Sequence, residues 1–172
     1  MAKTVTVFGS GKVPETDDAF KTALSLGRQL AQAGFALANG GYGGTMLAAA
    51  QGANEAGGTV IGVTCRAFKR SRANAYVTDE RPTETLNERL TALVALGDAY
   101  VVLPGGTGTL LELADVWEHK NKGFTDADKP IILVGDFWRP LVDMMTQQEA
   151  RCGACVRIVN DVDEVLDILR EL

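Results

Sequence analysis

The feature that most constrains this chain is an apolar run followed at once by a glycine-rich turn and a helical pattern. Residues 99–103 read as a buried strand, 104–108 hold three glycines, and 109–121 read as a helix. The amino end of a helix offers unpaired N–H groups and partial positive charge, and glycines let an anion approach the backbone closely. A capped helix after a tight turn is the alternative. The pattern favours a phosphate-binding turn made by Gly105, Gly106, Thr107, Gly108 and Thr109.

Apolar runs and helical patterns alternate along the whole chain. Such alternation predicts crossover units and a mostly parallel sheet covered on both faces. We therefore expect an α/β fold, a Rossmann-like three-layer α/β/α sandwich, as one domain over residues 1–172. The segment 66–82 is irregular and is expected to be a loop over the site. Strands are predicted at 4–8, 35–38, 59–63, 99–103, 131–134 and 156–159, and helices at 17–33, 45–56, 83–96, 109–121, 138–149 and 163–172.

Two further glycine loops follow predicted strands. Gly9-Ser10-Gly11 comes after the first strand, and Gly40–Gly44 comes after the second. In open parallel sheets, ligands bind at the carboxyl ends of strands where the strand order reverses. Three converging loops predict a nucleotide-sized phosphorylated ligand. The first loop is not a Walker A motif, because Val13 follows Lys12, and the second is not G-x-G-x-x-G.

Charge and hydropathy argue against several classes of partner. The chain of 172 residues has a net charge of −5 and no basic stripe, so nucleic acid is not expected as a partner. A local cluster, Arg66, Lys69, Arg70 and Arg72, is either a solvated loop or extra positive potential near an anionic ligand. No apolar run approaches the roughly 20 residues of a membrane span, and no signal segment is seen at the start. A cytoplasmic protein without a membrane partner is expected.

The cysteines do not indicate a metal or disulfide site. Three cysteines are too few for a disulfide framework. Cys152 and Cys155 have C-x-x-C spacing, but zinc would need a second pair or histidines, and His119 is the only histidine. An incidental pair in a reducing compartment is the favoured interpretation, and no metal is expected.

The turn also resembles a known signature. Residues 104–112, Pro-Gly-Gly-Thr-Gly-Thr-Leu-Leu-Glu, are similar to the Pro-Gly-Gly-x-Gly-Thr-x-x-Glu motif of the Lonely Guy (LOG) family, formerly labelled "possible lysine decarboxylase". Val7–Ser10 resembles the family's first phosphate loop, Asn39–Met46 its second, and Asn87–Arg89 its Glu-Arg-Lys segment. The resemblance implies a Rossmann-like dimer without a cofactor. It implies hydrolysis of the N-glycosidic bond of nucleoside 5′-monophosphates, cytokinin nucleotides among them.

The resemblance also implies roles for individual residues. It makes Arg89 and Glu112 catalytic, and a carboxylate can stabilise the positive charge that develops on the ribose. Taken alone, Arg89 could be a solvated helix residue, and Glu112 could merely favour a helix amino end. The predicted homodimer could form through helix 45–56 or helix 109–121. The nucleotide-binding residues implied beside the turn are Gly9, Ser10, Gly41, Gly44 and Met46.

Three positions depart from the family pattern. Leu90 stands where the family has a lysine, Leu111 where it has the first of two glutamates, and Thr107 where it has a tyrosine. These changes leave room for a second hypothesis, a non-catalytic carrier of a nucleotide or of the molybdenum cofactor, a phosphorylated pterin. Lysine decarboxylation is the weakest hypothesis, because it needs pyridoxal phosphate on a lysine and Lys12 is the only lysine in the glycine loops.

Overall fold

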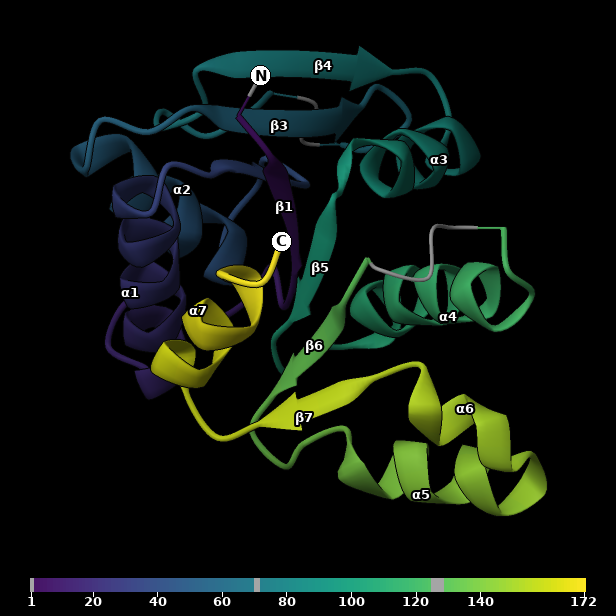
Figure 1. Cartoon of the computed structure of the whole chain (residues 1–172). Coiled ribbons are helices and arrows are strands. Elements are labelled where there is room, and N and C mark those ends of the chain that lie inside the picture. Colours follow the sequence, from purple (N-terminus) through teal and green to yellow (C-terminus); the bar gives the residue numbers. More distant parts are fainter. Residues whose placement is uncertain (1, 70–71, 125–128) are drawn as a thin grey trace.

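The computed structural model describes residues 2–69, 72–124 and 129–172 (Figure 1). Within these ranges, seven strands form one sheet and seven helices cover it. The strands are β1 (Thr4–Phe8), β2 (Ala36–Asn39), β3 (Val60–Cys65), β4 (Asp79–Thr83), β5 (Ala99–Val102), β6 (Ile131–Val134) and β7 (Arg157–Val159). The helices are α1 (Asp18–Gln32), α2 (Thr45–Glu55), α3 (Leu86–Leu96), α4 (Thr107–Asn121), α5 (Arg139–Gln148), α6 (Ala150–Ala154) and α7 (Val162–Leu169).

The order of the strands fixes where a ligand can bind. The order is β4-β3-β2-β1-β5-β6-β7, and every neighbouring pair is parallel. The chain builds outward from β1 to β4 and then returns to place β5 against the free side of β1. The order therefore reverses between β1 and β5, whose carboxyl ends lead into two of the glycine loops. This confirms the predicted α/β class and gives the ligand-binding position of an open parallel sheet.

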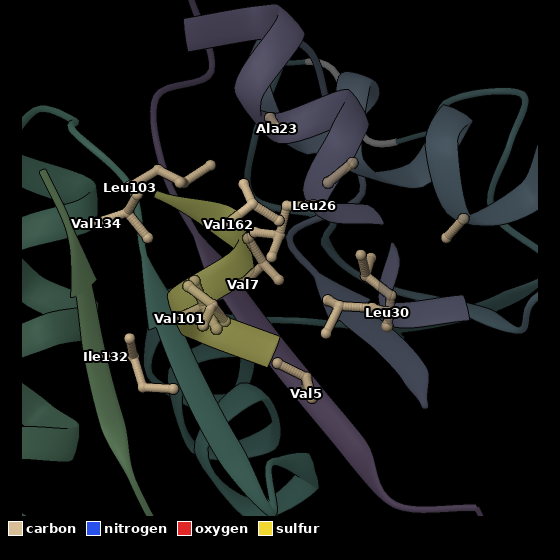
Figure 2. Packing of buried hydrophobic residues seen from close by; sticks show 14 of the residues in the cluster. Val5, Val7, Ala23, Leu26, Leu30, Val101, Leu103, Ile132, Val134 and Val162 are labelled. Atoms are coloured by element: carbon tan, nitrogen blue, oxygen red, sulfur yellow. The ribbon is translucent and has the colours of Figure 1, made fainter. Parts of the chain in front are cut away.

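The helices form two layers around the sheet. Figure 1 shows α1, α2 and α7 on one face and α3 to α6 on the other. Successive strand residues point to opposite faces, so Val5 and Val7 enter one core and Phe8 enters the other. Figure 2 shows the first core, where Leu26 and Leu30 of α1 lie near the valines of β1. The three-layer prediction is confirmed.

Helix α2 packs closely against α1. A Cβ on Gly27 would lie 2.0 Å from the carbonyl oxygen of Ala49, and one on Gly52 would lie 2.0 Å from that of Leu24. Only residues without a side chain allow the two backbones to approach so closely. One face of α2, a helix that we considered for the homodimer, is therefore packed against α1 within the protein.

Several local predictions were wrong, among them the start of helix 83–96, which begins at Leu86. The segment 66–82 is not all loop, because Asp79–Thr83 forms β4 at the edge of the sheet. Helix α4 begins at Thr107 rather than at residue 109, and the short helix α6 follows α5. Three of the five residues in β4 are charged and one is proline, which suits an edge strand but gives no apolar alternation.

No helix in the described ranges has both the length and the apolar character to cross a bilayer.

Candidate functional site

A cavity of about 540 Å³ lies at the carboxyl ends of β1 and β5. Residues from all three glycine loops and from helices α3 and α4 line it. A cavity of this size accommodates a small-molecule ligand. Most of the predicted site residues meet here, namely Gly9, Ser10, Met46, Arg89, Gly106, Thr107, Gly108, Thr109 and Glu112. Gly41, Gly44 and Gly105 are not part of the lining.

The amino end of α4 opens into the cavity. Gly106 is the N-cap and offers no side-chain hydrogen bond to the helix. The first intrahelical bond runs from Leu110 N to Gly106 O (2.9 Å), so the three preceding N–H groups have no acceptor within the helix. A Cβ on Gly106 or Gly108 would meet no protein atom within 4 Å. These glycines leave free space beside unpaired donors, which is the arrangement that an anion requires.

The three predicted glycines outside the lining hold the loops in place. A Cβ on Gly44 would lie 2.2 Å from Ser10 O, and one on Gly105 would lie 2.2 Å from Thr109 Oγ1. Gly41 has a φ of +74°, a backbone conformation that favours glycine. These glycines allow one loop or turn to pack closely on another, and they do not form part of the cavity surface.

Arg89 is fixed from several sides. Thr85 caps α3 by accepting a hydrogen bond from Glu88 N (3.2 Å), and Arg89 follows in the first turn. The side chain of Arg89 is only 8% exposed, and its Nε donates to Val63 O (2.9 Å). A Cβ on Gly40 would lie 1.8 Å from Arg89 Nη2, so the guanidinium occupies the space that this glycine leaves. Arg89 is therefore a positioned residue of the cavity and not a solvated helix arginine.

Glu112 pairs with Arg89 inside the cavity. Arg89 Nη1 lies 3.2 Å from Glu112 Oε1, and the carboxylate side chain is 12% exposed. Burial raises the pKa of Glu112 to about 7, although the nearby Arg89 charge acts in the opposite direction. A carboxyl group with a pKa near neutrality is typical of sites that perform acid–base or charge-stabilising chemistry.

Two aromatic residues that sequence reasoning missed complete the surroundings of Arg89. Its Cζ lies 5.7 Å from the ring centroid of Tyr42 and 5.7 Å from that of Phe68. The Tyr42 hydroxyl accepts from Cys65 N (2.7 Å), and Asn74 Nδ2 donates to Tyr42 O (2.9 Å). Tyr42 was visible only as a member of a glycine loop, and Phe68 lay in a stretch without a regular pattern. Both rings favour a cation over their faces.

The two leucines that depart from the family pattern face this same cavity. Leu90 of α3 and Leu111 of α4 both line it, and Leu86 lies beside them in the lining. Leu86 and Leu111 are each 42% exposed. The cavity therefore combines one polar end, at the start of α4, with an apolar wall between α3 and α4.

The cavity lining does not include the described members of the basic cluster, Arg66, Lys69 and Arg72, or the cysteines. Arg66 pairs with Glu84 at 2.8 Å in an exposed position, and Arg70 lies outside the described residues. Burial raises the pKa of the Cys155 thiol, the opposite of what a reactive C-x-x-C pair needs. Cys152 and Cys155 are both free thiols. Across the described ranges, no group of three or more histidine, cysteine or acidic residues could hold a metal ion.

Comparison with known sequences identifies relatives. The family model described as SLOG cluster4 matches residues 2–166. A cytokinin riboside 5′-monophosphate phosphoribohydrolase of Rhodococcoides fascians is 33% identical over 146 residues, which is 81% of this chain and 72% of that protein. The protein of the same name from Mycobacterium tuberculosis is 35% identical over 127 residues, covering 73% of this chain and 66% of that protein.

Solved structures of similar fold include proteins that are named for a different ligand, the molybdenum cofactor. The molybdenum cofactor binding protein of Rippkaea orientalis has a TM-score of 0.79 at 25% identity, covering 99% of this chain and 97% of that one. The molybdenum cofactor carrier protein of Chlamydomonas reinhardtii has a TM-score of 0.79 at 26% identity, covering 99% and 98%. The resemblance predicted from the glycine motif is confirmed by the family match. The chain belongs to the LOG family, as a member of the group described as SLOG cluster4.

Proposed function

We propose that this protein hydrolyses the N-glycosidic bond of a nucleoside 5′-monophosphate, releasing the free base and ribose 5-phosphate. The observation that carries the proposal is the buried Arg89–Glu112 pair, 3.2 Å apart, in the cavity that also contains the open amino end of α4. Relatives at 33% and 35% identity that bear the name of this activity support it. The reaction needs water and the nucleotide, and no cofactor.

Each part of the cavity has a role in this reaction. The N–H groups at the start of α4 bind the 5′-phosphate, and that remote binding energy orients the sugar. The C1′–N bond breaks as positive charge develops on the ribose, and the ionised Glu112 carboxylate stabilises this charge. Water then bonds to C1′ and loses a proton, while the departing base gains one. Arg89 orients the carboxylate and holds ribose or phosphate oxygens through its planar set of donors.

The decisive experiment incubates the purified protein with AMP and separates the products by chromatography. We expect adenine and ribose 5-phosphate in equal amounts. Glu112→Gln keeps the size of the side chain and removes the charge, so it should lower the rate by about a hundredfold or more. Glu118→Gln is the matched control, because Glu118 lies on the same helix, is 58% exposed and does not line the cavity. No base released from any of a panel of purine and pyrimidine nucleotides would refute the proposal.

A second candidate function is the binding and carriage of a phosphorylated ligand without turnover. The TM-score of 0.79 with two proteins named for the molybdenum cofactor favours it, as does the apolar wall that includes Leu90 and Leu111. In that case, the same glycine loops bind the phosphate of a pterin. Saturable binding of the molybdenum cofactor or its pterin precursor, with no product from AMP, would select carriage over hydrolysis.

A further inference from the structure

The charges of the cavity do not cancel before a ligand binds. Among the residues that the structure describes, three charged ones line it, Lys12, Arg89 and Glu112. Arg89 Nη1 lies 3.2 Å from Glu112 Oε1, and the two charges neutralise each other when the carboxyl group is ionised. Lys12 has no ion-pair partner among the residues that the structure describes. Within the described ranges, it is therefore the side-chain cation of the cavity that has no ion-pair partner.

The loop that carries Lys12 is fixed by the protein itself. Ser10 O accepts hydrogen bonds from Thr45 N (2.9 Å) and from Thr45 Oγ1 (3.2 Å). Lys12 N donates to Ser10 Oγ at 3.3 Å, which closes a tight turn. Gly44 allows this close approach, since a Cβ there would lie 2.2 Å from Ser10 O. The backbone of Lys12 is thus held at the cavity before any ligand arrives, and only its side chain has to be ordered on binding.

The first turn of α4 alone supplies only part of the charge that a phosphate dianion needs. A helix amino end is equivalent to about half of a positive charge. Leu90, the neighbour of Arg89 in the cavity lining, contributes no charge. Lysine is a compact cation on a flexible stem that suits a phosphate oxygen as a point charge.

We propose that Lys12 is a phosphate-binding residue of this site, which contacts the anionic end of the ligand from the loop opposite α4. The inference rests on the proposed function only in so far as the ligand carries a phosphate, and not on its hydrolysis. It places the specificity for phosphorylated over unphosphorylated ligands on one side chain of the β1 loop together with the α4 amides.

The test measures equilibrium binding by calorimetry, for ribose 5-phosphate and adenosine in the native background and for AMP in the Glu112→Gln background, which slows its cleavage. Lys12→Met should lower the affinity for AMP and for ribose 5-phosphate by about ten- to a hundredfold, which is the range for hydrogen bonds to charged groups. The affinity for adenosine should stay unchanged. Lys12→Arg should retain most of the affinity. Lys21→Met is the matched control, because Lys21 is an exposed lysine of α1 that does not line the cavity.

A compensating change sharpens the test. Leu90 lines the same cavity, so Leu90→Lys in the Lys12→Met protein should restore part of the lost affinity for ribose 5-phosphate. Far-UV circular dichroism verifies that each variant is folded. Unchanged phosphate affinity in Lys12→Met, an equal loss for adenosine, or no affinity of the native protein for either phosphorylated probe would overturn the inference. Phosphate binding that depends on Lys12 without release of adenine would uphold it and refute hydrolysis.

Discussion

At the scale of single residues, the Arg89–Glu112 pair is not explained by a contribution to the stability of the fold. Side chains that are 8% and 12% exposed lose most of their hydration, and buried ion pairs seldom repay that loss in full. Here the pair is held by Val63 O, by the space over Gly40 and by two aromatic rings. So many constraints on one guanidinium are expected where its position matters for chemistry.

The pKa of Glu112, about 7, makes two pH effects testable. If the ionised carboxylate stabilises the ribose cation, kcat/KM for AMP should rise with pH through about 7 and then level off. The free energy of unfolding should instead decrease over the pH range in which kcat/KM increases. Between the ordinary pKa of 4.5 and about 7, the folded protein keeps a proton that the unfolded chain has lost, so this contribution to the free energy of unfolding falls as pH rises.

The Glu112→Gln variant separates the contribution of the Glu112 carboxyl group from the contributions of other groups that titrate in the same pH range. The difference in unfolding free energy between native and variant protein, measured by urea titration at several pH values, should vary between pH 4.5 and 7 and stay constant above that window. A difference that is flat across the whole range would contradict the proposed pKa.

At the scale of elements, the first turn of α4 contains a glycine where the helix alone would favour another residue. Gly108 lies inside the helix, where alanine would be more favourable by up to about 1 kcal/mol. A Cβ there meets no protein atom within 4 Å, so Gly108→Ala should fold with equal or greater stability. Because the new methyl group enters the cavity beside the unpaired N–H groups, we expect at least tenfold weaker binding of ribose 5-phosphate.

Thermal unfolding and calorimetric binding check this prediction together. Ala114→Gly is the control, because Ala114 is an exposed residue of the same helix outside the cavity lining. This reverse exchange should lower the stability by up to about 1 kcal/mol and leave the affinity unchanged. If Gly108→Ala bound ribose 5-phosphate as tightly as the native protein, the first turn of α4 would not be the phosphate site.

How far the elements could be predicted from the sequence depends on burial. The β1 and β6 strands are continuous apolar or threonine-containing runs between turns, and their predicted bounds agree with the structure. The β4 strand could not be found, because an edge strand has little apolar surface to reveal it. Arg89 could be selected only through the family resemblance, since its burial depends on Gly40 and Val63, which are distant in sequence.

At the scale of the whole molecule, the two helix layers differ in what they leave exposed. Helix α2 is closely packed on α1, whereas α3 and α4 carry exposed leucines, Leu86 (42%), Leu110 (37%) and Leu111 (42%). Leu86 and Leu111 line the cavity, whereas Leu110 lies outside it, and an exposed leucine outside a ligand site is available for contact with another protein. Of the two helices considered for the predicted homodimer, α4 is therefore the one that stays available.

We expect the native protein to be a homodimer in solution, with twice the chain mass of 18.3 kDa by light scattering. Leu110→Glu should shift it to the monomer, because a charge placed in an apolar interface must be desolvated without a partner. Leu110 does not line the cavity, so the substitution leaves the ligand contacts intact. Phe137→Glu is the matched control, since Phe137 is 56% exposed and lies in the segment between β6 and α5, outside α3 and α4. A native protein that stays monomeric at micromolar concentration, or a Leu110→Glu protein that remains dimeric, would exclude α4 as the dimer surface.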